Sequence, residues 1–195
     1  MMNDLFVSPA PGWIQRARRT GSGSVHGKIT NHPSWTDTPM TQTSPARKAV
    51  RALVVNGRDE LLLIHWEDPL DGHEILEPPG GAVEPDESLE AALLRETAEE
   101  TGWDIQLCGT PRPHFRKTTW AGQTYEGTEW FCLARPLTAG QQTLETYERP
   151  WFRGVKWVPI DHLHVSQIPL EPPHLVSVLK DVMGQSPDST GGSLS

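Results

Sequence analysis

Three glutamates near the middle of the chain are the residues whose type and spacing could do chemistry. Glu99 and Glu100 follow Glu96 by three and four positions, so a helix would place the three carboxylates on one face. Like charges at these spacings cost an isolated helix roughly 0.2–0.5 kcal/mol per pair. Mg²⁺ would offset that repulsion, because it takes oxygen ligands and completes its shell with water and substrate phosphates. The group therefore predicts a divalent-metal site, although a run of glutamates is more often a solvated surface.

A helix over residues 89–101 would position these carboxylates. Ser88 is a suitable N-cap, because its hydroxyl can accept a hydrogen bond from a free backbone N–H of the first turn. Gly102 suits the left-handed residue that follows many helices. The face that carries the glutamates begins with the apolar residues Leu89, Ala92 and Leu93. We therefore expect a helix that packs at its start and carries acidic groups at its end.

Two glycines and a pair of opposite charges complete a pattern around this helix. Gly80 and Gly81 follow two prolines and allow a turn with positive φ and a close approach to a ligand. Glu87 and Arg95 carry opposite charges and could tie the loop to the helix. The stretch over residues 80–103, GGAVEPDESLEAALLRETAEETGW, resembles the Nudix box, the signature of the Nudix hydrolase family.

The resemblance implies a role for each matching residue. In the family, the equivalents of Glu96, Glu99 and Glu100 bind a divalent metal. This metal is Mg²⁺, and Mn²⁺ can take its place. The equivalent of Glu96 is often the base, and a backbone carbonyl matching that of Gly80 can add a metal ligand. The pair formed by Glu87 and Arg95 matches a structural salt bridge. Two packing positions differ from the usual pattern, namely Thr97, where the family prefers an aliphatic residue, and the bulky Trp103.

Composition limits the classes of protein that the chain can belong to. Its 195 residues allow one domain with tails, and its net charge of −8 argues against a protein that holds nucleic acid through phosphates. Two cysteines, Cys108 and Cys132, give no disulfide framework and are typical of a reducing compartment. No apolar run has the length needed to cross a bilayer. We therefore expect a cytoplasmic protein without membrane contact. The family resemblance implies a small-molecule nucleotide substrate, and a homodimer is left open.

The chain divides into three parts by composition. Residues 1–46 are rich in Pro, Gly, Ser and Thr and are expected to be disordered or loosely ordered. An alternative is that synthesis begins at Met40, which leaves the role of residues 1–39 open. Residues 47–183 form the predicted Nudix hydrolase domain, and residues 184–195 form a flexible polar tail.

The predicted domain has the element pattern of an α/β fold. Two β-rich runs over residues 50–55 and 61–66 are separated by a hairpin signal, and their continuous apolar character indicates strands buried on both faces. A second hairpin is expected from residues 114–120 and 125–134. Further short strands are expected at residues 75–77, 105–107 and 151–158, with a final helix over residues 172–183. The family resemblance implies an α/β/α sandwich with a mixed β-sheet.

Charged residues outside the box are further candidates for the site. Arg51 and Arg116 could contact substrate phosphates, and the fourth acidic group of the site could be Glu126, Glu129, Glu145 or Glu148. Glu77 could face the metal, although a carboxylate on the surface of a strand is the simpler interpretation. The aromatic residues Trp120, Tyr125 and Trp130 could stack on a base, but strand aromatics are more often core residues.

Together these observations predict a divalent-metal-dependent hydrolase. It would cleave a diphosphate bond in a nucleoside diphosphate linked to another moiety, such as a nucleotide sugar, an ADP-ribose-like compound, a dinucleoside polyphosphate or a nucleoside triphosphate. Water would attack phosphorus while Glu96 or a loop glutamate accepts the proton. The alternatives are a non-catalytic nucleotide-sensing or protein-binding module of the same fold, and an enzyme that removes terminal phosphates from RNA.

Overall fold

The computed structural model of the protein describes residues 48–137 and 150–184. Its elements follow one another as β1 (Ala49–Val54), β2 (Glu60–Glu67), β3 (Glu74–Glu77), α2 (Leu89–Thr101), β4 (Ile105–Leu107), β5 (Arg112–Trp120), β6 (Gln123–Pro136), β7 (Phe152–Pro159), the 3₁₀ helix η3 (Ile160–Val165) and α3 (Leu175–Gly184). Among these residues, no helix is long and apolar enough to cross a membrane. The expected properties of residues 1–46 and of the tail lie outside the described residues.

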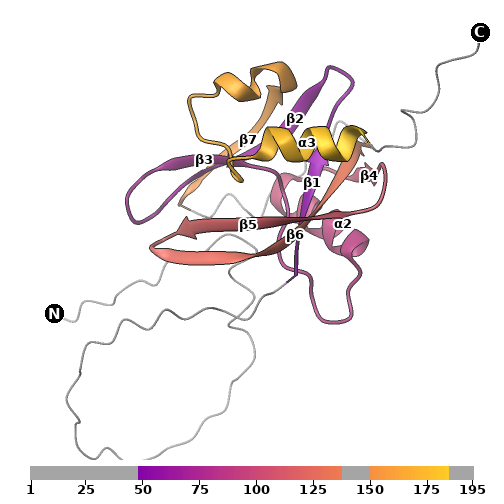
Figure 1. The fold of residues 1–195 in the computed structure, drawn as a ribbon, viewed down its shortest axis with the longest axis horizontal. Helices are drawn as coiled ribbons and strands as arrows, with labels where there is room; N and C mark the ends of the chain where they lie inside the picture. The colour runs from indigo at the N-terminus through magenta and orange to yellow at the C-terminus, as the bar shows by residue number, and fades with distance from the viewer. Residues whose placement is uncertain (1–47, 138–149, 185–195) are drawn as a thin grey trace, which may run out of the picture.

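The strands form two sheets, which lie side by side in Figure 1. In the four-stranded sheet, β6 pairs in parallel with β1 and antiparallel with β4 and β5. The second sheet is antiparallel and has the order β3-β2-β7. The mixed sheet and the α/β class agree with the predicted fold.

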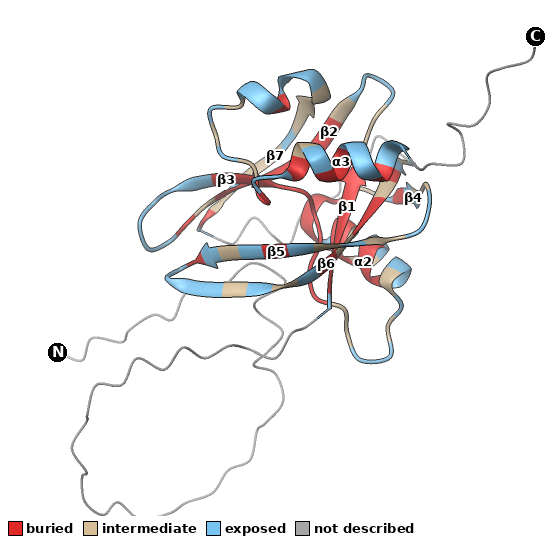
Figure 2. Cartoon of the chain, in the orientation of Figure 1, coloured by how far each residue is buried: buried red, intermediate tan, exposed pale blue. Residues whose placement is uncertain are grey.

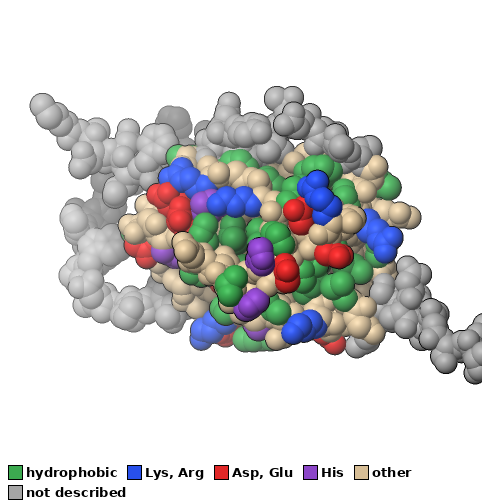
Figure 3. All heavy atoms as spheres, turned by 90° about the horizontal axis from the view of Figure 1, so that it is seen from above, with side chains coloured by type: hydrophobic (Ala, Val, Ile, Leu, Met, Phe, Trp, Pro, Cys, Tyr) green, Lys and Arg blue, Asp and Glu red, His purple; other side chains and the backbone are tan. Residues whose placement is uncertain are grey.

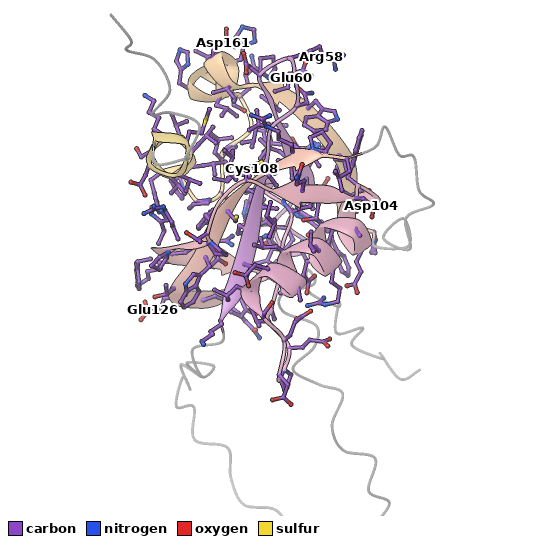
Figure 4. All side chains as sticks on the ribbon, turned by 90° about the vertical axis from the view of Figure 1, so that its right-hand side faces the viewer. Arg58, Glu60, Asp104, Cys108, Glu126 and Asp161 are labelled. Carbon is purple, nitrogen blue, oxygen red and sulfur yellow. The ribbon has the colours of Figure 1, made fainter. Side chains whose placement is uncertain are left out.

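The expected hairpin between the first two strands is wrong. β1 pairs with β6 and β2 pairs with β3 and β7, so the two strands belong to different sheets. Only an isolated bridge between Val55 and Leu61 joins them beside the turn, where Arg58 and Glu60 form the salt bridge whose residues are labelled in Figure 4. The turn brings the chain from one sheet to the other. The second predicted hairpin is confirmed by β5 and β6, which turn at Ala121 and Gly122.

Two apolar layers separate the helices from the strands. Because successive strand residues point to opposite faces, β1 sends Val50, Ala52 and Val54 into the core beneath α2, and Leu53 into the core beneath α3. Figure 2 shows that buried residues run along the whole of β1 and most of β2. The prediction that these strands are buried on both faces is therefore confirmed.

The final helix is also confirmed and begins slightly later than predicted. Its apolar face packs into the core with Leu53 and Phe131, and the buried residues of that face are Leu175, Val178, Leu179 and Val182. Helices thus lie against opposite faces of β1 and β6, which gives the α/β/α arrangement.

Candidate active site

The helix predicted to carry the three glutamates is α2, and its ends lie where its capping residues place them. The Ser88 Oγ accepts a hydrogen bond of 3.1 Å from the backbone N–H of Ala91. Gly102 has a left-handed φ of 72°, and its N–H donates to the carbonyl of Ala98 at 2.9 Å. Ala92 and Leu93 anchor the helix in the core. The sequence prediction of this helix is confirmed at both ends.

The three candidate ligands in the C-terminal half of α2 differ in their exposure. Glu96 and Glu100 are 2% and 3% exposed, whereas the Glu99 side chain is 47% exposed. A carboxylate pair is therefore buried beneath the turn at Gly80 and Gly81, with a third carboxylate at the protein surface beside it.

The two glycines make different contacts with the helix. The N–H of Gly80 donates to Oε2 of Glu100 at 2.9 Å, and Gly80 has a φ of 151°. A Cβ atom built on Gly80 would lie 2.0 Å from the carbonyl oxygen of Val50. A Cβ atom built on Gly81 would instead lie 2.6–2.8 Å from the carboxylate atoms of Glu96. The turn thus touches both buried carboxylates, and neither glycine leaves space for a side chain.

Arg95 holds the loop and the acidic face together. Its Nε and Nη2 donate to the two carboxylate oxygens of Glu87, both at 2.8 Å, which confirms the predicted salt bridge. Its Nη1 donates to Glu96 at 2.6 Å and to Glu99 at 3.3 Å. Its Nη2 also donates to the carbonyl of Ala82 at 3.1 Å. One guanidinium therefore orients two of the three candidate ligands.

The electrostatics of the buried pair fit a cation. Burial and the nearby charge of Glu96 raise the pKa of Glu100 to about 8, although Arg51 and the N–H of Gly80 act in the opposite direction. A hard divalent cation favours the charged form of both carboxylates and takes oxygen ligands of this kind. The residues present therefore fit the metal that the box implies, with Glu96, Glu99 and Glu100 as the groups that would hold it. The backbone carbonyl of Gly80, the fourth predicted ligand, accepts a hydrogen bond of 3.3 Å from Arg51 and has a second lone pair for a metal.

A second group of charges lies beneath the glycine turn. This buried charge cluster consists of Arg51, Arg116, Glu77, Glu129 and Glu171. The Nη2 of Arg116 donates to Glu77 at 3.0 Å, its Nη1 donates to Glu129 at 2.9 and 3.1 Å, and its Nε donates to Glu171 at 2.9 Å. Arg51 lies 3.2 Å from Glu77 and 3.5 Å from Glu129.

Burial and neighbouring charges shift the pKa values of three groups of this cluster. Burial alone would raise the pKa of Glu129, but the positive charges of Arg51 and Arg116 outweigh it and leave the pKa lowered. For Glu171, burial outweighs the opposing charge of Arg116 and the pKa is raised. Burial lowers the pKa of Arg116, and the surrounding carboxylates raise it by more, so this guanidinium stays charged.

Comparison with known proteins decides the family. The family model described as the NUDIX domain matches residues 45–181. The chain belongs to the Nudix family. Because its relatives include named pyrophosphohydrolases, it is a Nudix hydrolase and an enzyme.

Relatives and solved structures agree with this assignment. One relative is a protein of Bacillus subtilis (strain 168) whose name gives 8-oxo-dGTP diphosphatase as a provisional activity. It is 29% identical over 121 residues, which cover 60% of this chain and 69% of the relative. An RNA pyrophosphohydrolase of Gluconacetobacter diazotrophicus is 27% identical over 135 residues, which cover 61% of this chain and 80% of the relative. The fold is similar to that of a NUDIX hydrolase from Nitrosomonas europaea, with a TM-score of 0.53, 22% identity and coverage of 76% and 97%. A NUDIX-family hydrolase from Clostridium perfringens has a TM-score of 0.51, 16% identity and coverage of 72% and 97%.

The other candidates for the Nudix site lie in different places. Glu129 is buried among the arginines, as described above. Glu126 projects from the surface in Figure 4, where it pairs with Lys117 at 3.3 Å. Glu145 and Glu148 lie outside the described residues. Trp120 is a core residue, packed with Ile64, Ile75 and two further tryptophans, as expected for a strand aromatic.

Sequence reasoning placed one member of the buried charge cluster wrongly and missed another. Glu77 is only 2% exposed, so the simpler interpretation of a strand-surface carboxylate is wrong. Glu171 was not singled out at all, because it lies between prolines far along the chain from the box. No local pattern connects either residue with Arg116, since the contacts exist only after the strands pair.

The loop after β2 carries a separate group of possible metal ligands. Asp68, Asp71 and His73 can each offer one atom, all within 4.8 Å of one another. Both carboxylate oxygens of Asp68 already accept backbone hydrogen bonds of 2.7 Å, one from Leu70 and one from Ala121. The group thereby ties the loop between β2 and β3 to the turn between β5 and β6.

Proposed function

We propose that this enzyme hydrolyses a diphosphate bond in a nucleoside diphosphate linked to another moiety, with Mg²⁺ held by Glu96, Glu99 and Glu100 of α2. The observation that carries the proposal is the buried pair Glu96 and Glu100 beneath the glycine turn, with Glu99 beside them at the surface. When bound, the metal would neutralise the diphosphate and lower the pKa of a water molecule. Mn²⁺, a hard cation of the same charge, is the natural substitute in experiments.

The residues of the chain supply position and a proton acceptor. Arg95 fixes the carboxylate of Glu96 through its hydrogen bond of 2.6 Å, and the tight contact with Gly81 restricts that carboxylate from the other side. Glu96 is our first candidate for the group that accepts a proton from the attacking water, with the glutamates at 145 and 148 as the other candidates. No side-chain nucleophile is needed, since phosphoryl transfer depends mainly on positioning and charge neutralisation.

The substrate is a small nucleotide rather than a long nucleic acid. The chain has a net charge of −8. On the face in Figure 3, the visible Lys and Arg side chains are interspersed with acidic and apolar ones and do not form one basic patch. Nucleic-acid backbones are bound through clusters of positive charge. A cytoplasmic location with its nucleotide pool is consistent with this substrate class and is part of the proposal.

The test is a hydrolysis assay on Glu99→Gln, which removes one carboxylate charge at an exposed position and leaves the size of the side chain unchanged. The panel contains ADP-ribose, a nucleotide sugar, a dinucleoside polyphosphate, 8-oxo-dGTP and a 5′-triphosphorylated RNA oligonucleotide, each with Mg²⁺ and with Mn²⁺. We expect metal-dependent turnover that falls about 100-fold or more in the variant, because even residues that only support metal ligands change activity 10–100-fold. Glu90→Gln, on an exposed face of the same helix, is the matched control and should retain activity.

Two outcomes would contradict the proposal. One is wild-type turnover by Glu99→Gln on the preferred substrate, which would show that the reaction does not depend on these carboxylates. The other is turnover confined to the RNA oligonucleotide, which would replace the small-nucleotide class by RNA 5′ ends, the class in the name of the Gluconacetobacter diazotrophicus relative.

A further inference from the structure

The backbone carbonyls of the glycine turn are all held by strand β1. The backbone N–H of Ala52 donates to the carbonyl of Pro79 at 2.8 Å, and the N–H of Val50 donates to that of Gly81 at 2.9 Å. The carbonyl of Pro78 precedes these two along the chain, and that of Gly80 lies between them. A single side chain binds both, because Nη1 of Arg51 donates to Pro78 at 3.0 Å and to Gly80 at 3.3 Å. Four consecutive carbonyls thus point at one strand.

Gly80 connects Arg51 with a candidate metal ligand through two successive peptide groups. Its carbonyl accepts from Arg51, and its N–H donates to Oε2 of Glu100 at 2.9 Å. Pro78 and Pro79 have no N–H, so the first donor that the turn can offer to α2 is that of Gly80. The peptide group between Pro79 and Gly80 therefore holds the Glu100 carboxylate, and the two carbonyls that Arg51 binds belong to the peptide groups on either side of it.

The buried charge cluster fixes Arg51 in turn. The Arg51 side chain is 1% exposed and lies within 3.2–3.5 Å of carboxylate oxygens of Glu77 and Glu129. Arg116 contacts the same two carboxylates. A guanidinium is planar and presents several donors in fixed directions, which a lysine ammonium does not. Only an arginine at this position can pair with the carboxylates and bind the two carbonyls together.

We infer that Arg51 is a positioning residue of the metal site. It binds the carbonyls on both sides of the Pro79–Gly80 peptide and so fixes this peptide with its N–H toward Glu100, in place for the metal. It does not itself contact the metal or the substrate. This inference rests on the proposed function for the identity of the metal site. It differs from the earlier expectation that Arg51 meets substrate phosphates, and the two make opposite predictions for substrate affinity.

The experiment compares Arg51→Lys with Glu171→Gln in the full-length chain. Arg51→Lys keeps the buried positive charge and loses the bond pair to Pro78 and Gly80, whereas Glu171→Gln disturbs the same cluster and leaves those bonds intact. Mn²⁺ affinity is measured by electron paramagnetic resonance. Amide hydrogen exchange of Gly80 is measured by nuclear magnetic resonance in metal-free protein, with the amide of Val55, bonded to Ala134, as the internal reference.

We expect Arg51→Lys to weaken Mn²⁺ binding about 10-fold or more, as residues that orient metal ligands usually do. Exchange of the Gly80 amide should accelerate by a similar factor while that of Val55 does not change. At saturating Mn²⁺, kcat should fall and KM should stay within about threefold, because an interaction confined to positioning the reacting groups affects kcat. Glu171→Gln should stay within about threefold of the wild type in Mn²⁺ affinity and Gly80 exchange.

Three results would overturn the inference. The first is a folded Arg51→Lys with wild-type Mn²⁺ affinity and Gly80 exchange. The second is an equal loss of Mn²⁺ affinity in Glu171→Gln, which would make the effect a general one of the cluster. The third is a rise in KM with unchanged kcat and metal affinity, which would make Arg51 a substrate contact. Because the first two use no substrate, the inference can stand if hydrolysis is absent and can fail if hydrolysis is confirmed.

A second variant decides the matter if Arg51→Lys does not fold. The double variant Arg51→Met, Glu129→Gln removes one charge of each sign, so the cluster keeps its net charge. Neutral side chains at both positions leave no new unpaired buried charge, which is the main cause of instability after a buried ion pair is broken. Its reference is Glu129→Gln alone. A double variant that binds Mn²⁺ at least 10-fold more weakly than Glu129→Gln supports the inference, and equal affinities refute it.

Discussion

Alanine substitutions at Gly80 and Gly81 should have opposite consequences although the residues are adjacent. At Gly81, the added Cβ meets the carboxylate of Glu96, which is the end of a flexible side chain. At Gly80, it meets the backbone carbonyl of Val50 at 2.0 Å, with a φ of 151° that L side chains rarely adopt. We therefore expect Gly81→Ala to impair the site and Gly80→Ala to impair the fold.

The magnitudes follow from how far each distance to the added Cβ atom falls short of an ordinary van der Waals contact. At Gly81 the distance is 2.6–2.8 Å, so the Glu96 carboxylate must move by roughly 0.6–0.8 Å to regain ordinary contact. A misplacement of this size at a reacting centre costs about 100-fold in rate. At Gly80 the backbone itself must move, and the combined strain of φ and overpacking is about 2–5 kcal/mol. In a domain of this size that lowers Tm by roughly 5–20 °C.

The assay measures Tm and metal-dependent kcat/KM for both variants on the preferred substrate. Gly81→Ala should keep its Tm within a few degrees and lose about 100-fold in kcat/KM. Gly80→Ala should instead have a Tm that is lower by roughly 5–20 °C. A Gly81→Ala enzyme with full turnover would show that the Glu96 carboxylate does not need its observed place. A Gly81→Ala protein as unstable as Gly80→Ala would show that the turn is primarily a folding element.

Two further predictions concern stability. Thr97 is fully buried on α2, and its hydroxyl has no hydrogen-bond partner in the structure. Thr97→Val should therefore raise the free energy of unfolding, measured by urea titration, by about 1 kcal/mol and leave kcat unchanged. A destabilised variant would contradict this prediction. Burial lowers the pKa of His65, helped by the charge of Lys156 and opposed by Glu74. The unfolded chain therefore binds the proton more readily. The stability contributed by neutral His65 is present above about pH 6.5 and is lost as the pH falls from that value through the lower pKa of the folded state. His65→Gln should flatten the dependence of Tm on pH between about 7.5 and 5.5, and an unchanged slope would exclude His65 as its source.

The helix α2 could be predicted from the sequence because its determinants are local. Ser88 caps a backbone N–H three residues away, and Gly102 takes its left-handed conformation next to the last turn. The salt bridge between Glu87 and Arg95 spans only eight positions. Interactions of this kind depend on neighbours in the chain, so they are the same in every fold that contains the segment.

The pairing of the strands could not be predicted in the same way. β1 and β2 are buried on both faces, so their apolar residues show no alternation that would distinguish one partner strand from another. The turn between them has the residues of a hairpin, but β1 pairs with β6, about 80 positions further along the chain. This parallel pairing joins segments that are far apart in the chain, and no short pattern encodes it.

The buried charge cluster allows positioning to be separated from stability. Replacing a buried ion pair by uncharged side chains of similar size is often neutral or stabilising, since the desolvation cost of the two charges is removed as well. If Arg51 served only stability, an uncharged substitute for it and its partner would leave the Gly80 turn unchanged. Its two bonds to the carbonyls of the turn are directional, however, and no apolar side chain can replace them. A cluster variant that keeps its Tm and loses Mn²⁺ affinity would thus show that these charges determine the geometry of the Glu100 carboxylate.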